Sequence, residues 1–322
     1  MYPTNRPFVR QTLILSRLTR STRKAFAVSP TPFALLLLFC GGLECKANPN
    51  SLFRGAAALA DTRHAVSFGE RPSGSAANQK LRDWILAELK ATGAQVSLDS
   101  FSGRTPEGAI PMVNVIAKFP GSSGKAVAIS GHFDTKKIAG KLFLGANDAG
   151  SSTGFLIEFA RAMAKSKHRD DIYLVFFDGE EALGEWSDTD SRYGSRHLAA
   201  KWLADGTLTH LVALINVDMI GDKDLDILND ANSSASLREM AKQAAAKLGY
   251  AKHFRQDEGA IDDDHRPFAE VGVNVIDLID FDYGPNQAYW HTEKDTMDKL
   301  SAQSLQIVGD VVLEITKELD VK

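Results

Sequence analysis

Five short segments of this 322-residue chain carry acidic or histidine side chains of the kinds that bind metal ions. Three directly follow apolar runs typical of buried strands, one opens an expected helix, and one precedes the last expected helix. Their polar side chains are His132 with Asp134, Asp148, Asp178 with Glu180 and Glu181, Asp218, and His291. Carboxylates that follow an apolar strand are costly to bury without a cation. Carboxylates combined with imidazole suit zinc, and three protein ligands beside one open position are typical of a catalytic zinc site.

Each of these segments is a weak signal when it is taken alone. An aspartate at the start of a helix is usually a helix cap, and a pair of glutamates usually lies on a solvated surface. The set is more specific, and the adjacent Glu180 and Glu181 suggest a division of labour. One carboxylate can bind the metal while its neighbour stays free as a general acid and base. The residue types therefore predict a metal-dependent, hydrolase-like site.

Strands and helices are expected to alternate along the chain around these segments. The continuous apolar runs at 171–177 and 210–217 are typical of strands that are buried on both faces. Further strands are expected at 95–101, 112–119, 125–130 and 271–279, and helices at 48–66, 74–92, 151–166, 198–203, 233–248 and 300–319. This alternation predicts a single α/β domain with a mixed, largely parallel central sheet flanked by helices. Ligands of such sheets bind beyond the carboxyl ends of the strands, where the acids and histidines fall.

The composition excludes several classes of protein. The chain is 44% hydrophobic and 24% charged, as ordinary globular proteins are. Its net charge of −4 supplies no positive field for a polyanion, so nucleic-acid binding is not expected. No repeat or coiled-coil pattern argues for assembly, so a monomer is expected.

The first part of the chain differs from the rest. Residues 1–45 hold six basic residues and one acidic residue, and an apolar run of about 15 residues at 25–39 contains two prolines. A basic start, a short apolar run and small residues predict a secretory signal, because a transmembrane helix needs about 20 apolar residues. We expect residues 1–47 to be an export segment, cleaved after Ala47 or lipid-anchored through Cys40, and residues 48–322 to be the catalytic domain.

Export changes what the composition means. Without residues 1–45 the chain keeps 31 basic and 40 acidic residues, a net charge of −9. Both cysteines, Cys40 and Cys45, lie in the expected export segment, so no disulfide is expected in the mature domain. The expected location is periplasmic, extracellular or membrane-anchored as a lipoprotein, with membrane contact only through this segment or its lipid.

The ordered motifs resemble the zinc aminopeptidase superfamily that includes the glutaminyl cyclases. The resemblance covers about residues 50–320 and rests on His132-Phe-Asp134, Ala146-Asn-Asp148, Asp178-Gly-Glu180-Glu181-Ala182, Asp218-Met-Ile-Gly221 and Trp290-His291-Thr292. Several features look like the cyclase branch: Trp186 after the glutamate pair, Tyr193-Gly-Ser-Arg-His-Leu-Ala199, Asp263-Asp-His265, and Trp290 directly before His291.

The resemblance implies a fold, a zinc ion and a reaction. The fold is that of the zinc aminopeptidases, and the single catalytic zinc is held by Asp148, Glu181 and His291. Glu180 is implied as the general acid and base, and the other implied site residues are Asp218 and Asp263 as hydrogen-bonding carboxylates and Trp186 and Trp290 as the pocket lining. The implied reaction converts the N-terminal glutamine of peptides or proteins to pyroglutamate and releases ammonia.

Other readings of the same residues stay open. His132 and Asp218 are suitable ligands for a second zinc bridged by Asp148, and Glu180 would then activate water in an aminopeptidase. Asp134 is expected to orient His132 in either case. An inactive binding ectodomain is a third reading, which the filled motif positions disfavour. Ordinary roles also remain: a surface anchor for Trp186, core packing for Trp290 and a helix cap for Asp263.

Two places depart from the cyclase pattern. Asp262, directly before Asp263, adds a negative charge near the expected substrate entrance. The polar and acidic stretch 280–288 does not align with that pattern and is a candidate for the pocket rim.

Overall fold

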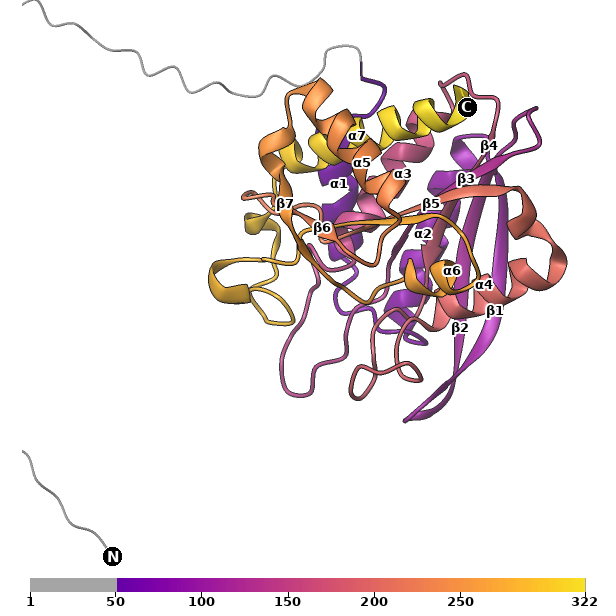
Figure 1. Ribbon diagram of the computed structural model, residues 1–322. Helices are drawn as coiled ribbons and strands as arrows, with labels where there is room; N and C mark the ends of the chain where they lie inside the picture. The colour runs from indigo at the N-terminus through magenta and orange to yellow at the C-terminus, as the bar shows by residue number, and fades with distance from the viewer. Residues whose placement is uncertain (1–50, 322) are drawn as a thin grey trace, which may run out of the picture. The chain divides into compact units, whose positions relative to one another are not determined.

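A six-stranded mixed sheet forms the centre of the computed structural model, which describes residues 51–321 (Figure 1). The expected export segment, residues 1–47, lies outside the described residues. The strands run in the order β1-β2-β4-β3-β5-β8. Their bounds are β1 Gln95–Thr105, β2 Gly108–Phe119, β3 Ala126–His132, β4 Asp171–Phe177, β5 Leu211–Asp218 and β8 Val275–Ile279. Strands β4, β3, β5 and β8 are mutually parallel, and the β1–β2 hairpin adds to β4 in the antiparallel sense.

The apolar runs explain why the four parallel strands are largely buried, including β8 at the edge of the sheet. All seven residues of β3 and all five of β8 are buried, as expected for strands covered on both faces. Alternate side chains of β3 point into different cores: Val127 and Ile129 into one, Ala126 and Ala128 into the other. The sheet is therefore the middle layer of three.

Helices cover the two faces unequally. The larger core joins the sheet to α1 Gly55–Val66, α2 Ala76–Ala91, α3 Gly150–Met163, α5 Ala235–Leu248 and α7 Ala302–Val321. The smaller core packs α4 Tyr193–Asp205 and α6 Arg266–Glu270 against the other face. Figure 1 shows α5 and α7 beside each other, in agreement with their direct packing. The predicted single α/β domain with a mixed, largely parallel sheet is confirmed.

Several predicted boundaries were wrong for identifiable reasons. The first helix begins at Gly55 rather than at residue 48. The predicted strand 271–279 shrinks to β8, because Gly272 adopts a positive φ of 88° in a turn. The hairpin strands run further than expected, and Thr105 pairs with Gly108 across a two-residue turn. No helix in residues 51–321 is long and apolar enough to cross a bilayer.

A small second sheet was not predicted. It pairs β6 Ile227–Asp230 with β7 Phe254–Gly259 in parallel. The sequence of β7 is Phe-Arg-Gln-Asp-Glu-Gly, which has neither an apolar run nor a clear alternation. The short helix α6 was also missed, because five residues are too few for a helical period. The loop between β7 and α6 carries Asp263, so these missed elements position part of the site.

Candidate active site

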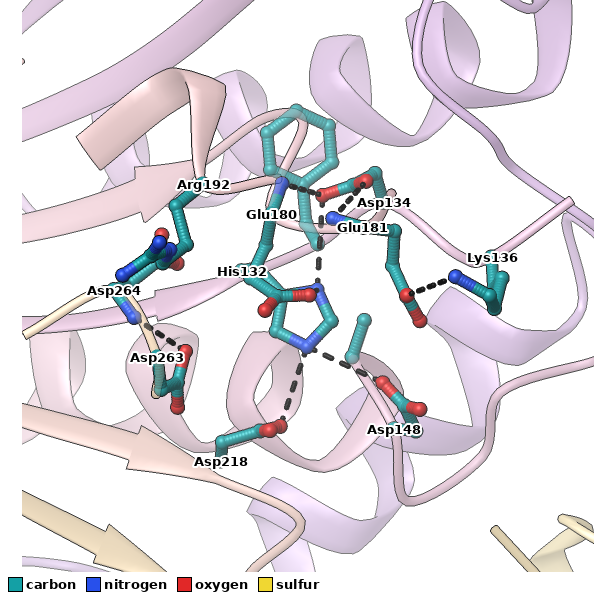
Figure 2. A network of polar contacts seen from close by, with 12 residues as sticks. His132, Asp134, Lys136, Asp148, Glu180, Glu181, Arg192, Asp218, Asp263 and Asp264 are labelled. Atoms are coloured by element: carbon teal, nitrogen blue, oxygen red, sulfur yellow. Dashed lines mark hydrogen bonds and ion pairs between the residues drawn. The ribbon is translucent and has the colours of Figure 1, made fainter. Parts of the chain in front are cut away.

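The polar side chains gather where the central strands end. His132 and Asp218 are the last residues of β3 and β5. Glu180 and Glu181 follow β4, and Asp148 lies on the connection from β3 to α3. The prediction that these segments meet at the carboxyl edge of the sheet is confirmed, and Figure 2 shows their side chains converging.

Sharp backbone turns aim these side chains. Six non-glycine residues between 51 and 321 have positive φ, and two of them, Ala149 (φ 76°) and Met219 (φ 50°), directly follow Asp148 and Asp218. His291 itself has φ 51°. Such conformations cost of order 1–3 kcal/mol each and cluster at functional sites. Three of the six positions are therefore either a metal-binding residue or the residue directly after one.

The first donor set consists of Asp148, Glu181 and His291, whose ligand atoms all lie within 4.8 Å of one another. His291 Nε2 lies 3.2 Å from Asp148 Oδ2 and 3.1 Å from Glu181 Oε1. Burial lowers the pKa of His291, but Glu181 and Asp148 outweigh it and raise the pKa to about 10. These surroundings favour a positive charge between the three groups. Two carboxylates and one imidazole also form an ordinary ligand set for zinc, so the residues fit this ion.

The second donor set consists of His132, Asp148 and Asp218, and it shares Asp148 with the first. His132 Nε2 lies 3.3 Å from Asp148 Oδ1 and 3.2 Å from Asp218 Oδ1, and both contacts are drawn in Figure 2. Burial lowers the pKa of His132, yet the charge of Asp218 and the contacts with Asp134 and Asp148 raise it well above its usual value. The arrangement therefore has the donors for two metal ions bridged by one carboxylate.

Glu180 belongs to neither donor set and lines the same pocket. Its residue is only 6% exposed. Burial raises the pKa of Glu180 well above its usual value; His132 opposes the rise, and Glu181, Asp263 and Asp264 add to it. A free, buried carboxylate with a raised pKa can both take and return a proton near neutral pH.

Asp218 and Asp263 are two further buried carboxylates of the pocket. Burial raises the pKa of Asp218 to about 7; His132 opposes the rise, and Asp263 and Asp148 add to it. Asp263 Oδ2 accepts a hydrogen bond of 3.0 Å from Asn216 Nδ2. The structure therefore brings five acidic candidates to one pocket, namely Asp148, Glu180, Glu181, Asp218 and Asp263. The Asp178 carboxylate is not among them and accepts instead from Ser73, Asn78 and the Val113 amide.

The pocket itself has a volume of about 200 Å³. Sites for drug-sized ligands run to roughly 300–1,000 Å³, so this pocket suits one residue at the end of a chain. Trp186 and Trp290 both line it, and the remaining apolar lining is Met219, Ile261, Ile279 and Phe281. The Trp290 ring stacks on His291 with centroids 4.0 Å apart and also meets Phe281. Trp186 is 40% exposed and stands at the opening.

Three supporting residues were not identified from the sequence. Buried Asp295 accepts hydrogen bonds from the backbone amides of Asn147 (2.8 Å) and Asp148 (3.1 Å). Buried Arg71 donates to the carbonyls of the same loop at Leu144 and Gly145. Lys136 Nζ lies 3.4 Å from Glu181 Oε2. A single sequence carries no signal for them, because each acts through contacts between distant segments.

A further buried cluster lies behind Asp263. His265 Nε2 faces Asp230 Oδ2 at 3.3 Å, and His265 Nδ1 faces Asp277 Oδ2 at 3.6 Å. The sequence singled out Asp263 and His265 but not Asp230 or Asp277. Those two acids lie on β6 and β8, which sequence patterns placed poorly or missed.

One expectation about a single residue is extended and another needs correction. Asp134 Oδ1 lies 3.6 Å from His132 Nδ1, at ion-pair distance, and the carboxylate also accepts from the backbone amides of Glu180 and Glu181. It therefore contacts the histidine, as expected, and positions the glutamate pair as well. Asp262 does not present an unbalanced negative charge, because it pairs with Arg192 and Arg266. From the stretch 280–288, Phe281 lines the pocket.

The chain is similar to proteins of known family and structure. A model of peptidase family M28 matches residues 114–316. A glutaminyl-peptide cyclotransferase of Drosophila melanogaster is 28% identical over 251 residues, which are 70% of this chain and 70% of that protein. The crystal structure of an Acidobacteriales bacterium glutaminyl cyclase is 42% identical, with 86% of this chain and 97% of that chain covered and a TM-score of 0.81. A Zn-dependent exopeptidase from Parabacteroides distasonis is 28% identical, with 82% and 98% covered and a TM-score of 0.73.

The family model spans more than half of the chain, and the solved cyclase matches almost over its whole length. The resemblance inferred from the motifs is therefore confirmed. The chain belongs to peptidase family M28, in the branch of that family that includes the glutaminyl cyclases.

Proposed function

We propose that this protein converts the N-terminal glutamine of peptides and proteins to pyroglutamate with release of ammonia, using one zinc ion held by Asp148, Glu181 and His291. The observation that carries the proposal is the free carboxylate of Glu180 beside this donor set, in a small pocket walled by tryptophans. The relatives named glutaminyl cyclase support it.

The proposed cyclisation needs a group that transfers a proton, and it needs no attacking water. The α-amine attacks its own γ-amide carbon, a carbon–nitrogen bond forms, and the bond to the amide nitrogen breaks. Asp148, Glu181 and His291 would hold the zinc ion, which would supply polarisation of the γ-carbonyl oxygen. Glu180 takes a proton from the attacking amine and returns it to the departing nitrogen, so that ammonia leaves and Glu180 is regenerated.

The remaining pocket residues orient the substrate. Asp218 and Asp263 accept hydrogen bonds from the amine and the amide nitrogen, which face the acidic side of the pocket. Trp290, fixed by its stacking on His291, and Trp186 form the apolar walls of a slot. A slot that folds the glutamine side chain back toward its own amine raises the rate by proximity.

A dinuclear zinc aminopeptidase is the second candidate. The second donor set, which shares Asp148 with the first, is the observation that favours it. The related Zn-dependent exopeptidase shows that the fold is compatible with peptide cleavage. In that enzyme class Glu180 would activate water instead of the substrate amine.

One assay separates these functions. The purified protein is incubated with a glutamine-initiated peptide and with a leucine-initiated peptide of the same remaining sequence, and ammonia and free amino acid are followed. Ammonia without shortening of the peptide supports the cyclase, and free leucine supports the aminopeptidase. If neither ammonia nor free leucine is released, the result supports an inactive binding domain. Zinc per chain, one or two, is measured alongside by atomic absorption.

We also propose that residues 1–47 are an export segment and that the catalytic domain works as a monomer outside the cytoplasm. The basic start, the short apolar run and the lack of cysteines after Cys45 support this proposal. Mass spectrometry of the mature N-terminus tests the cleavage, and metabolic labelling with a fatty acid tests lipidation at Cys40. A mature chain that still begins at residue 1 contradicts export, and light scattering tests the monomer.

A further inference from the structure

Trp186 is a pocket wall that needs support from outside the pocket. It lies on the rim insert, residues 183–192, between the glutamate pair and α4. At 40% exposure its ring is poorly held by packing alone. Two polar contacts restrain it instead: its Nε1 donates to Asp262 Oδ2 at 3.3 Å, and the Arg192 guanidinium lies 5.7 Å from its ring centroid.

Arg192 is the centre of this arrangement. Its side chain is only 3% exposed and forms an ion pair with Asp262 Oδ1. Its backbone has a positive φ of 50°, and its amide donates to the carbonyl of Glu180 at 2.7 Å. Arg192, which contacts Trp186 on the rim insert, is thus hydrogen-bonded to the backbone of Glu180, the proposed general base.

Asp262 contacts both Arg192 and Trp186. One carboxylate oxygen pairs with Arg192 and the other accepts from Trp186. Arg266, the first residue of α6, lies 3.6 Å away and adds a second cation. The carboxylate therefore joins the rim insert to the loop that carries Asp263, and its charge is balanced by two arginines.

We infer that Arg192 and Asp262 form a latch that holds Trp186 as one wall of the substrate pocket, so that they set substrate affinity without taking part in the chemistry. The inference rests on the proposed function for its kinetic consequences, but not for the latch itself. Arg192 is a positioning residue, because it acts through Trp186 and does not line the pocket, whereas Asp262 holds Trp186 and also lines the pocket itself. The balanced charge of Asp262 also means that the latch gives no preference for a basic second residue in the peptide.

The test compares Asp262→Ala with Asp188→Ala. Asp188 is a matched control, because it also pairs with Arg192, at 3.1 Å, but its side chain is 97% exposed. We expect Asp262→Ala to raise KM about five- to tenfold with little change in kcat, since it removes a charged pair and a hydrogen bond. Asp188→Ala should leave both constants unchanged. Equal KM values for the wild type and Asp262→Ala overturn the latch.

A measurement that does not depend on activity accompanies the kinetics. The chain has four tryptophans, and the signal of Trp186 is isolated by subtracting the fluorescence of a Trp186→Phe variant. Acrylamide should quench Trp186 more strongly in Asp262→Ala than in the wild type or in Asp188→Ala. Unchanged quenching overturns the latch even if the enzyme is active. Increased quenching in a protein that cyclises no glutamine peptide sustains the latch and overturns the proposed function.

Charge selectivity gives a further check. The wild type should turn over Gln-Lys and Gln-Glu peptides with similar kcat/KM, and Asp262→Ala, which leaves Arg192 and Arg266 unbalanced, should favour Gln-Glu by about threefold. A shift toward Gln-Lys contradicts the charge balance described here. If Asp262→Ala fails to fold by circular dichroism, Arg192→Lys asks the same question, because lysine keeps the charge but loses the planar contact with Trp186. Its KM should rise and its Trp186 quenching increase, and wild-type values for both overturn the latch.

Discussion

The floor and the rim of the pocket are built in different ways. The floor consists of Asp148, Glu180, Glu181, Asp218 and His291, which come from strand ends and strained turns and are almost all buried. The rim consists of Trp186, Arg192 and Asp262, which come from loops and meet through side-chain contacts at the surface. The sheet edge thus holds groups whose position must not change, whereas the loops hold groups that adjust affinity.

This difference has an energetic counterpart. The floor gathers four carboxylates with little access to water, an arrangement that opposes folding unless protons or a cation balance the charge. The charges of the rim are paired with one another: Arg192 is buried, and Asp262 is partly solvated. Substitutions on the floor should therefore change kcat or metal binding, and substitutions on the rim should change KM.

The largest expected effect is that of Glu180→Gln. Glutamine keeps the shape of the side chain but cannot carry the proton, so kcat should fall by about a thousandfold or more. Zinc content and KM should stay near those of the wild type, because Glu180 is outside the donor set of Asp148, Glu181 and His291. Steady-state ammonia release and metal analysis measure both. Glu185→Gln, an exposed acid on the rim insert, is the control and should keep full activity.

Asp218→Asn tests whether the floor holds one metal or two. For a mononuclear cyclase we expect kcat to fall about a hundredfold, because a proton-accepting carboxylate is lost, while zinc per chain stays near one. The second donor set includes Asp218, so a dinuclear enzyme should instead lose one of two zinc ions. A fall in bound zinc from two to one contradicts the single-zinc proposal, and the effect on kcat alone does not decide the matter.

Asp295→Asn tests the support beneath the floor. Asp295 accepts from the amides of Asn147 and Asp148 and from the Tyr283 hydroxyl at 2.7 Å. Losing its charge should loosen the loop that carries Asp148 and weaken zinc affinity about tenfold, as is usual for residues that orient a metal ligand. Competition with a chelator measures the affinity. Tyr283→Phe removes only one of the three bonds and should have a smaller effect; an equal effect would show that the tyrosine, not the amides, matters.

The floor was largely predictable from the sequence, and the rim was not. Asp148, Glu180 and Asp218 stand directly after apolar runs or before a helix, so the topology of a parallel sheet is enough to bring them together. His291 was placed by its motif alone, because its segment has no regular structure. The β1–β2 hairpin, α4 and α5 were predicted in part, because the hydrophobic pattern is clear in the middle of each element but not at its ends.

The rest depended on contacts that no local pattern encodes. In the sequence, nothing distinguishes Arg192 from the other polar residues before the helix, yet it pairs with Asp262, 70 residues further along the chain. The sequence correctly indicated that Asp262 carries a negative charge. It did not show that this charge is balanced, because the ion pair with Arg192 joins segments that are distant in the sequence. Likewise β7 has neither an apolar run nor an alternation of polar and apolar residues, and it is a strand because it pairs with β6.

Asp280 gives the smallest and most specific test, because it lies one residue beyond β8 at the same edge of the sheet but belongs to neither donor set. It is 1% exposed, and its Oδ2 accepts from the Asp226 amide at 2.9 Å. Burial, with help from the charges of Asp222 and Asp226, raises its pKa to about 7.

Because the folded state then binds the proton more tightly than the unfolded state, the free energy of unfolding should fall as the pH rises from about 4 to 7. Asp280→Asn removes this titration, so urea unfolding should show a gain of about 3 kcal/mol at pH 8 relative to the gain at pH 4.5. Activity should not change, because no proton or metal of the floor depends on Asp280. An equal gain in the free energy of unfolding at both pH values would contradict the raised pKa of Asp280. A loss of activity would instead show that Asp280 belongs functionally to the floor of the pocket.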